Sequence, residues 1–315
     1  MNKQIALILK GMAMGIAEVI PGVSGGTIAF ITGIYETLLN SIKSALGPEI
    51  ITSLRKGGVP GAWKAINGPF LIFLMAGMVI GFVTGVFGVA HLLESYPVLV
   101  WSFFFGLIIA SAIYIGRKVK QWNWQAILGL VLATVIAYWI TIATPAQGTD
   151  ALWMVFIAGA IAISALILPG ISGSFILLLM GMYTVIFPEI KNALSTFETG
   201  SLIVVAVFGI GCLVGLGTIA RALSWMFKQY RNTTLAVLTG FMIGSLNKIW
   251  PWRNVVSTRI DSSGEEVPFL EKSVLPAQFE GETYLLMAIV MILLGFAIVF
   301  VLERFDKTEV ESGSK

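Results

Sequence analysis

Two short motifs of proline, glycine and serine lie in apolar surroundings, and their residue types suit anion binding. They are Pro21-Gly22-Val23-Ser24-Gly25-Gly26-Thr27 and Pro169-Gly170-Ile171-Ser172-Gly173-Ser174. Proline removes a backbone donor and glycine adds backbone freedom, so each motif predicts a break in a helix. A helix that begins at such a break presents unpaired N–H groups, and the serine and threonine hydroxyls add donors for a phosphate or carboxylate. The alternative is a pair of glycine-lined kinks that only pack helices.

Three charged side chains lie within or at the ends of the apolar segments. Glu18 precedes Pro21 by three residues, and an intramembrane carboxylate is a functional candidate, here as the carrier of a coupling proton. The alternative for Glu18 is a cap on the second half-helix. Arg221 lies inside an apolar run, about 10 Å from the boundary marked by Lys228. Its planar guanidinium can bind phosphate through two hydrogen bonds. The alternative is that the side chain only extends to the membrane surface, where its charge is hydrated. Glu36 is expected to be a solvated residue at a helix end.

The composition places these motifs in a membrane. Of the 315 residues, 57% are hydrophobic and 12% are charged, whereas soluble domains carry roughly 25% charged residues. Runs long enough to cross a bilayer recur along the whole chain. They cover residues 5–42, 70–92, 97–116, 124–144, 151–187, 201–227, 233–249 and 284–302. We therefore expect one integral membrane domain over residues 1–302, and the single cysteine excludes an intramolecular disulfide.

A sequence repeat relates the two motifs. A shift of 148 residues places Gly11–Lys43 on Gly159–Lys191, with both motifs in register. A shift of 134 residues continues the match through the next two apolar segments. Matching pairs include Gly33 with Gly181, Tyr35 with Tyr183, Gly77 with Gly211, Gly81 with Gly215, Gly106 with Gly240 and Ser111 with Ser245. The small residues at four-residue spacing, Gly77, Gly81 and Gly85, predict close helix packing.

The distribution of lysine and arginine predicts the orientation of the two repeats. If each broken segment enters and leaves on one side, 15 of the 20 basic residues lie on one side of the membrane and 5 on the other. If each crosses once, the division is 8 to 12. The positive-inside rule favours the first arrangement, so these basic residues report orientation and not nucleic-acid binding. Three crossings then separate the repeats, which makes them inverted, with both termini cytoplasmic. Inverted repeats with interrupted helices are typical of transporters that bind substrate near the midplane.

The expected architecture is an all-α polytopic membrane protein with two inverted-topology repeats. Each repeat is a broken re-entrant helix pair plus two transmembrane helices. The expected ranges are repeat one at 5–116, a linking helix at 124–144, repeat two at 151–249, a periplasmic loop at 250–283, a final helix at 284–302 and a cytoplasmic tail at 303–315. The cytoplasmic loop at 43–69 is expected to hold a short surface helix. The periplasmic loop is expected to form a small hairpin from Val255–Ile260 and Val267–Leu270 around Asp261-Ser262-Ser263-Gly264.

The sequence contains no zinc motif, Walker A loop or nucleophile elbow, and it has one histidine. These patterns carry most of the metal, nucleotide and hydrolase chemistry that a sequence can reveal. We therefore expect no metal and no cofactor, and we do not expect an enzyme.

The motif residues support a family resemblance. Gly11-Met12-Ala13-Met14-Gly15, followed by Glu18-Val19-Ile20 and the first motif, resembles the bacterial and archaeal PopT family of polyprenyl-phosphate transporters. Leu168 and the second motif look like the family's second signature. The resemblance extends over about residues 5–302.

The resemblance implies a substrate and a direction. Members are similar to translocases that return undecaprenyl phosphate to the cytoplasmic leaflet of the bacterial inner membrane for reuse in cell-wall and surface-glycan synthesis. The residues that match the motifs, with Glu18, would carry the phosphate site. Arg221 rests on the physical argument alone. Proton or ion coupling through Glu18 is expected.

Two alternatives remain from the residues. Undecaprenyl-pyrophosphate phosphatases also have broken membrane helices, inverted repeats and a Pro-Gly-x-Ser motif, but they carry an arginine after the serine and need a glutamate cluster. Here Gly25 and Gly173 occupy that arginine position. The other alternative is a transporter of small soluble anions.

Overall fold

The computed structural model describes residues 3–20, 22–260 and 266–312. The first helices are α1 (Lys3–Val19), α2 (Gly25–Ile31), α3 (Tyr35–Ala45), α4 (Pro48–Ala65), α5 (Gly68–Ser95), α6 (Pro97–Arg117) and α7 (Trp124–Ile142). They are followed by α8 (Leu152–Ile167), α9 (Gly173–Leu179), α10 (Tyr183–Ser195), α11 (Thr199–Gln229) and α12 (Arg231–Ser245). The chain ends with β1 (Arg253–Ile260), β2 (Glu266–Ser273), the 3-10 turn η1 (Pro276–Gln278) and α13 (Leu285–Ser312).

Within the described residues, five helices are long and apolar enough to cross a membrane. They are α5, α6, α7, α11 and the Leu285–Glu303 part of α13. The bent pair α9–α10, with 113° between its helices, could supply a sixth span. The expectation of an all-α polytopic membrane protein is confirmed. The helix α13 continues beyond its apolar part to Ser312, where the sequence predicted a tail from residue 303.

Each long broken segment contains three helices, not the two that the motifs predicted. The second break in each segment follows a glycine in the left-handed region, Gly33 with φ 74° and Gly181 with φ 70°. Both sites form the same helix end: Ile34 N–H donates to the Ala29 carbonyl, and Met182 N–H donates to the Leu177 carbonyl. This is a Schellman motif, which ends a helix wherever glycine accepts a positive φ.

The glycine ridges lie where α1 packs on α5 and where α8 packs on α11. A Cβ added to Gly77 would lie 2.2 Å from the Ile8 carbonyl oxygen, and one added to Gly211 would lie 2.2 Å from that of Phe156. Ile8 and Phe156 are themselves related by the 148-residue shift. Only a residue without a side chain permits these backbones to approach so closely, so the predicted packing role of the glycines is confirmed.

The linking helix α7 and the final helix α13 each pack against a helix from a different half of the chain. Helix α7 packs on α12 of the second half, and α13 packs on α6 of the first. Gly106 of α6 faces the Ile292 carbonyl, and Gly240 of α12 faces the Leu130 carbonyl. The two halves are thus held together by small-residue contacts at corresponding positions.

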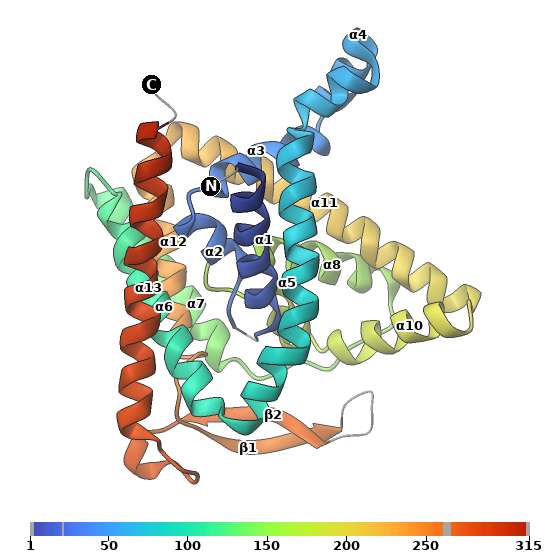
Figure 1. Cartoon of the computed structure of the whole chain (residues 1–315). Helices are drawn as coiled ribbons and strands as arrows, with labels where there is room; N and C mark the ends of the chain where they lie inside the picture. The colour runs from blue at the N-terminus through green and yellow to red at the C-terminus, as the bar shows by residue number, and fades with distance from the viewer. Residues whose placement is uncertain (1–2, 21, 261–265, 313–315) are drawn as a thin grey trace.

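The strands β1 and β2 pair antiparallel, as the sequence predicted, while the predicted turn at residues 261–264 lies outside the described residues. We call the end of the molecule at β1 and β2 the hairpin end. The α4 segment, where the sequence predicted a short surface helix, consists of two helices joined by a bend at Gly58. It projects from the opposite end, which we call the α4 end (Figure 1). Helix α13 runs between the two ends (Figure 1).

Candidate phosphate site between the broken helices

The first break in each segment has the same backbone shape in both halves. Gly22 has φ 87° and Gly170 has φ 86°, a conformation that costs an L-residue with a side chain about 1–2 kcal/mol. Pro169 is buried between α8 and α9, while Pro21 lies outside the described residues. Both turns therefore depend on glycines at matching positions, and each turn changes the direction of the chain before a seven-residue helix.

The structure brings the two motifs into direct contact. The Gly170 N–H donates to the Thr27 hydroxyl over 3.2 Å, and the Ser24 hydroxyl donates to the Leu166 carbonyl over 2.7 Å. Ser24 and Thr27 are both fully buried. A Cβ on Gly26 would lie 2.2 Å from the Ile167 carbonyl oxygen, so the backbone of α2 touches the end of α8. The first motif is thus a packing and hydrogen-bonding partner of the second.

The start of α2 is closed by its own neighbours. The Gly25 N–H donates to Glu18 Oε1 over 2.7 Å, and the Gly26 N–H donates to the Ser24 hydroxyl over 3.0 Å. The expectation that this helix presents unpaired N–H groups to an anion is wrong for these two residues. Glu18 has the capping contact that was the alternative to proton coupling.

The start of α9 differs from that of α2. In the described part of the chain no side chain caps this helix, and the Ser172 and Ser174 hydroxyls bond to each other over 2.9 Å. The residue that corresponds to Glu18 in this half is Leu166, which has no oxygen in its side chain to offer. Because of this one difference, the start of α9 has fewer side-chain hydrogen-bond acceptors than the start of α2.

A small pocket lies at the second motif and reaches the first. It is lined by Gly22, Gly170, Ile171, Ser172, Phe175 and Lys248, together with Ala137, Ile140, Thr141 and Ser245. Its volume is about 10 Å³, room for about one water molecule. The loops must separate before a phosphate can enter.

Lys248 is the cation at this pocket, and the sequence analysis counted it only as a loop charge. It lies between the end of α12 and β1, with Nζ 4.4 Å from the centre of the Phe175 ring. Glu271 of β2 lies 3.7 Å from Lys248 Nζ and 2.9 Å from Arg253 Nη1. Burial, and then the neighbouring Arg253, lower the pKa of the Lys248 ammonium to about 8, and the opposing effect of Glu271 is smaller. The sequence feature that could have identified Lys248 was its position at the end of the apolar run 233–249.

Arg221 does not join this site. Its guanidinium donates to the Leu46 carbonyl at the end of α3 and, over 3.2 Å, to the Gly217 carbonyl of its own helix. The side chain is exposed. In this structure Arg221 ties α11 to α3, and Lys248 takes the place at the motifs that the sequence analysis gave to Arg221.

The fold and the site together define a class. Irregular backbone at the centre of a bundle of membrane helices is tolerated where protein or a polar cavity surrounds it. Here two glycine turns from different halves of the chain meet beside a partly buried lysine, Lys248. Broken helices that meet at a polar site are typical of secondary transporters.

Comparison with known proteins gives the family. The VCA0040-like family, described as undecaprenyl phosphate translocase-like, matches residues 14–267. A polyprenyl-phosphate transporter of Vibrio cholerae is 44% identical over 305 residues, which is 96% of each chain. A polyprenyl-phosphate transporter of Staphylococcus aureus is 31% identical over 258 residues, 78% of this chain and 85% of the relative. No solved structure matches. The chain belongs to this undecaprenyl phosphate translocase-like family.

Proposed function

We propose that this protein transports undecaprenyl phosphate, a polyprenyl-phosphate carrier lipid, from the outer to the inner leaflet of the bacterial inner membrane. The observation that carries the proposal is the pocket where both glycine turns meet Lys248, because a partly buried cation beside hydroxyls and backbone donors suits a phosphate group. The names of the two relatives supply the lipid. The long tail would stay in the bilayer while the headgroup passes between the halves.

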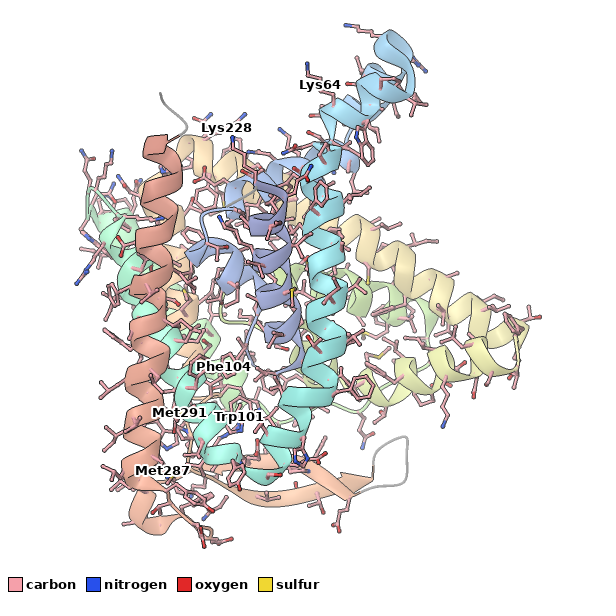
Figure 2. The ribbon with its side chains drawn as sticks, viewed as in Figure 1. Lys64, Trp101, Phe104, Lys228, Met287 and Met291 are labelled. Carbon is pink, nitrogen blue, oxygen red and sulfur yellow. The ribbon has the colours of Figure 1, made fainter. Side chains whose placement is uncertain are left out.

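The proposed orientation puts the hairpin end in the periplasm and both termini in the cytoplasm. The 15-to-5 division of basic residues supports it. Lys64 and Lys228, which belong to the larger group, both lie toward the α4 end, whereas Trp101 and Met287 lie toward the hairpin end (Figure 2). The matched glycine turns and ridges support the proposal that the two halves are repeats of one unit, and the division of basic residues supports their inversion.

The binding step would begin with an exchange of partners at the hairpin end. Lys248 and Arg253 share the Glu271 carboxylate, so an arriving phosphate competes with Glu271 for Lys248. The Ser172 and Ser174 hydroxyls and the adjacent backbone N–H of Gly173 would add donors once the loops separate. Arg253 keeps its closer contact with Glu271, which leaves that carboxylate paired during the exchange.

The transport step would require the two halves to move against each other. The Ser24–Leu166 and Thr27–Gly170 hydrogen bonds join the motifs, and a rocking motion of the halves must break or rearrange them. Glu18 remains our candidate for proton coupling, since release of its hydrogen bond to Gly25 would free a carboxylate beside the path.

We also propose that the chain is not an enzyme. Both relatives are named as transporters, and glycines occupy the position after each motif serine where pyrophosphate phosphatases carry arginine.

The test is translocation by purified protein in liposomes that contain undecaprenyl phosphate. A probe that cannot cross the membrane would report the lipid exposed outside, and depletion of the protein in cells should raise the same surface signal. Protein-dependent loss of exposed lipid is the expected result. Release of phosphate from the pyrophosphate lipid would indicate the phosphatase instead. Flux of soluble phosphate in liposomes without the lipid would indicate a small-anion transporter.

A further inference from the structure

A second pocket lies at the α4 end and is lined by none of the motif residues. It is lined by Glu36, Leu39 and Asn40 of α3, by Ser224, Phe227 and Lys228 of α11, and by Arg231 at the start of α12. Its volume is about 230 Å³, far larger than the pocket at the motifs. Lys228, one of its cations, lies near the end of the molecule where α4 projects (Figure 2).

The pocket holds an ion pair that a ligand could replace. Arg231 donates from Nη1 and Nη2 to the two oxygens of Glu36, over 3.0 and 2.8 Å. The two side chains are 56% and 44% exposed, and ion pairs with this exposure contribute little net stability. Glu36 is therefore not simply a solvated residue at a helix end, as the sequence suggested. It occupies a guanidinium fork whose geometry fits phosphate as well as carboxylate.

A buried hydroxyl in the same pocket lacks a partner. Ser224 is 5% exposed, and its Oγ has no hydrogen-bond partner among the described residues. Other hydroxyls bond back to their own helix: Thr218, also on α11, to the Val214 carbonyl, and Thr234 on α12 to the Tyr230 carbonyl. A buried polar group without a partner in a native protein calls for an explanation, and a ligand in the pocket supplies one.

A buried aromatic cluster separates this pocket from the motif site. Phe227, which lines the pocket, contacts Tyr35 and Phe30. The Tyr35 hydroxyl donates to the Ile167 carbonyl, beside the second motif. A ligand in the pocket is therefore close to the motifs but is not in the same cavity.

We infer that this pocket is a second binding site for a phosphate group, in which Ser224, Lys228 and Arg231 hold the anion and Arg231 exchanges Glu36 for it. Two sources have the required chemistry, the headgroup of a polyprenyl phosphate and soluble inorganic phosphate. The lipid source rests on the proposed function, and the site itself does not. For the lipid, the pocket would receive the headgroup at the end of the molecule opposite the hairpin.

The experiment measures phosphate binding to the purified full-length protein in nanodiscs of zwitterionic lipid. Inorganic phosphate and undecaprenyl phosphate are titrated separately, each against wild type and against a Lys248→Met protein, in which the motif site is weakened. In both backgrounds we expect Ser224→Ala to weaken phosphate binding roughly tenfold, as the loss of one hydrogen bond to a charged group does. Glu36→Gln should tighten binding by up to about fivefold, because it frees the fork of Arg231.

The control is Ser102→Ala on α6, which removes another buried hydroxyl without a partner among the described residues but does not line the pocket. Both alanine variants should melt at or above the wild-type temperature, so a loss of binding confined to Ser224→Ala cannot be a folding defect. Binding of both ligands identifies a headgroup site, and binding of inorganic phosphate alone identifies a soluble-phosphate site.

Unchanged affinity in Ser224→Ala and in Arg231→Met would overturn the inference, whatever the transport result. A wild-type protein that binds phosphate through Ser224 but moves no lipid would instead refute the proposed function and leave this site in place.

Discussion

Replacing Lys248 with methionine should stabilise the protein and weaken its binding of phosphate. The lysine side chain is 19% exposed, and the pKa of its ammonium falls from 10.5 to about 8 in the folded protein. A fall of this size favours the neutral amine by roughly 3 kcal/mol. Since the folded pKa lies below the unfolded one, the charge costs stability below pH 8, and this cost declines as the pH rises from about 8 to 10.5. Methionine has a similar length and no charge, so the variant should gain roughly 1–3 kcal/mol at pH 7.

The effect on binding has the opposite sign. A hydrogen bond to a charged group contributes about 1.5–3 kcal/mol, so loss of the ammonium should weaken phosphate binding between about tenfold and 150-fold. With a pKa of about 8, about nine-tenths of the free protein carries the charge at pH 7 and about one-tenth at pH 9. Wild-type affinity should therefore fall about tenfold across this interval, while the affinity of Lys248→Met stays constant.

The assay combines thermal unfolding with titration of undecaprenyl phosphate into the protein in nanodiscs at pH 7, 8 and 9. Lys272→Met is the matched control, because Lys272 follows Glu271 on β2 but is exposed and does not line the pocket. Wild-type affinity in Lys248→Met, or an equal loss in Lys272→Met, would refute the assignment of Lys248 to the phosphate site.

Three further predictions follow from the contacts. Gly26→Ala places a Cβ 2.2 Å from a carbonyl oxygen of α8 and should prevent stable folding, whereas Gly88→Ala, with nothing within 4 Å, should be tolerated. The yield of detergent-solubilised protein and its melting temperature measure this, and a well-folded Gly26→Ala protein would contradict it. Glu18→Gln keeps an oxygen to accept the N–H at the start of α2, so transport should survive if Glu18 only caps, whereas a proton carrier should lose coupled transport in this variant and in Glu18→Ala alike. In a background without the native cysteine, Lys272→Cys should react with a membrane-impermeant thiol reagent in intact cells and Lys64→Cys should not; the reverse pattern would invert the proposed orientation.

Local sequence signals were sufficient for much of the fold. Glycine ridges, proline–glycine breaks and the alternating strands depend on residues that are close in the chain, and each of these features has a counterpart in the structure. The second break in each segment was missed because no proline stands beside Gly33 or Gly181. Their pairing in the repeat was visible, and a glycine kept at the same position in both copies indicates a backbone requirement.

The side chains that form the candidate site were harder to predict from the sequence. The contact between Thr27 and Gly170 spans 143 residues, and no local pattern encodes it. Arg221 looked suitable because it interrupts an apolar run, but its side chain reaches the end of α3 instead. Lys248 was overlooked because its three-dimensional neighbours, Phe175 and Glu271, come from α9 and β2. Long-range packing decides which cation meets the motifs.

The two motifs have the same backbone conformation but different side-chain partners. This difference matters if a duplicated unit binds a single ligand. Gly22 and Gly170 adopt the same φ within 1°, so the repeat fixes the turns. At the first turn Glu18 satisfies the start of α2, and Ser24 reaches across to the other half. At the second turn Leu166 replaces the carboxylate, and Lys248 lines the pocket. An acidic cap like Glu18 would repel a phosphate at the start of α9, so we expect an anion to bind at the second motif and not at the first, once it has displaced Glu271 from Lys248.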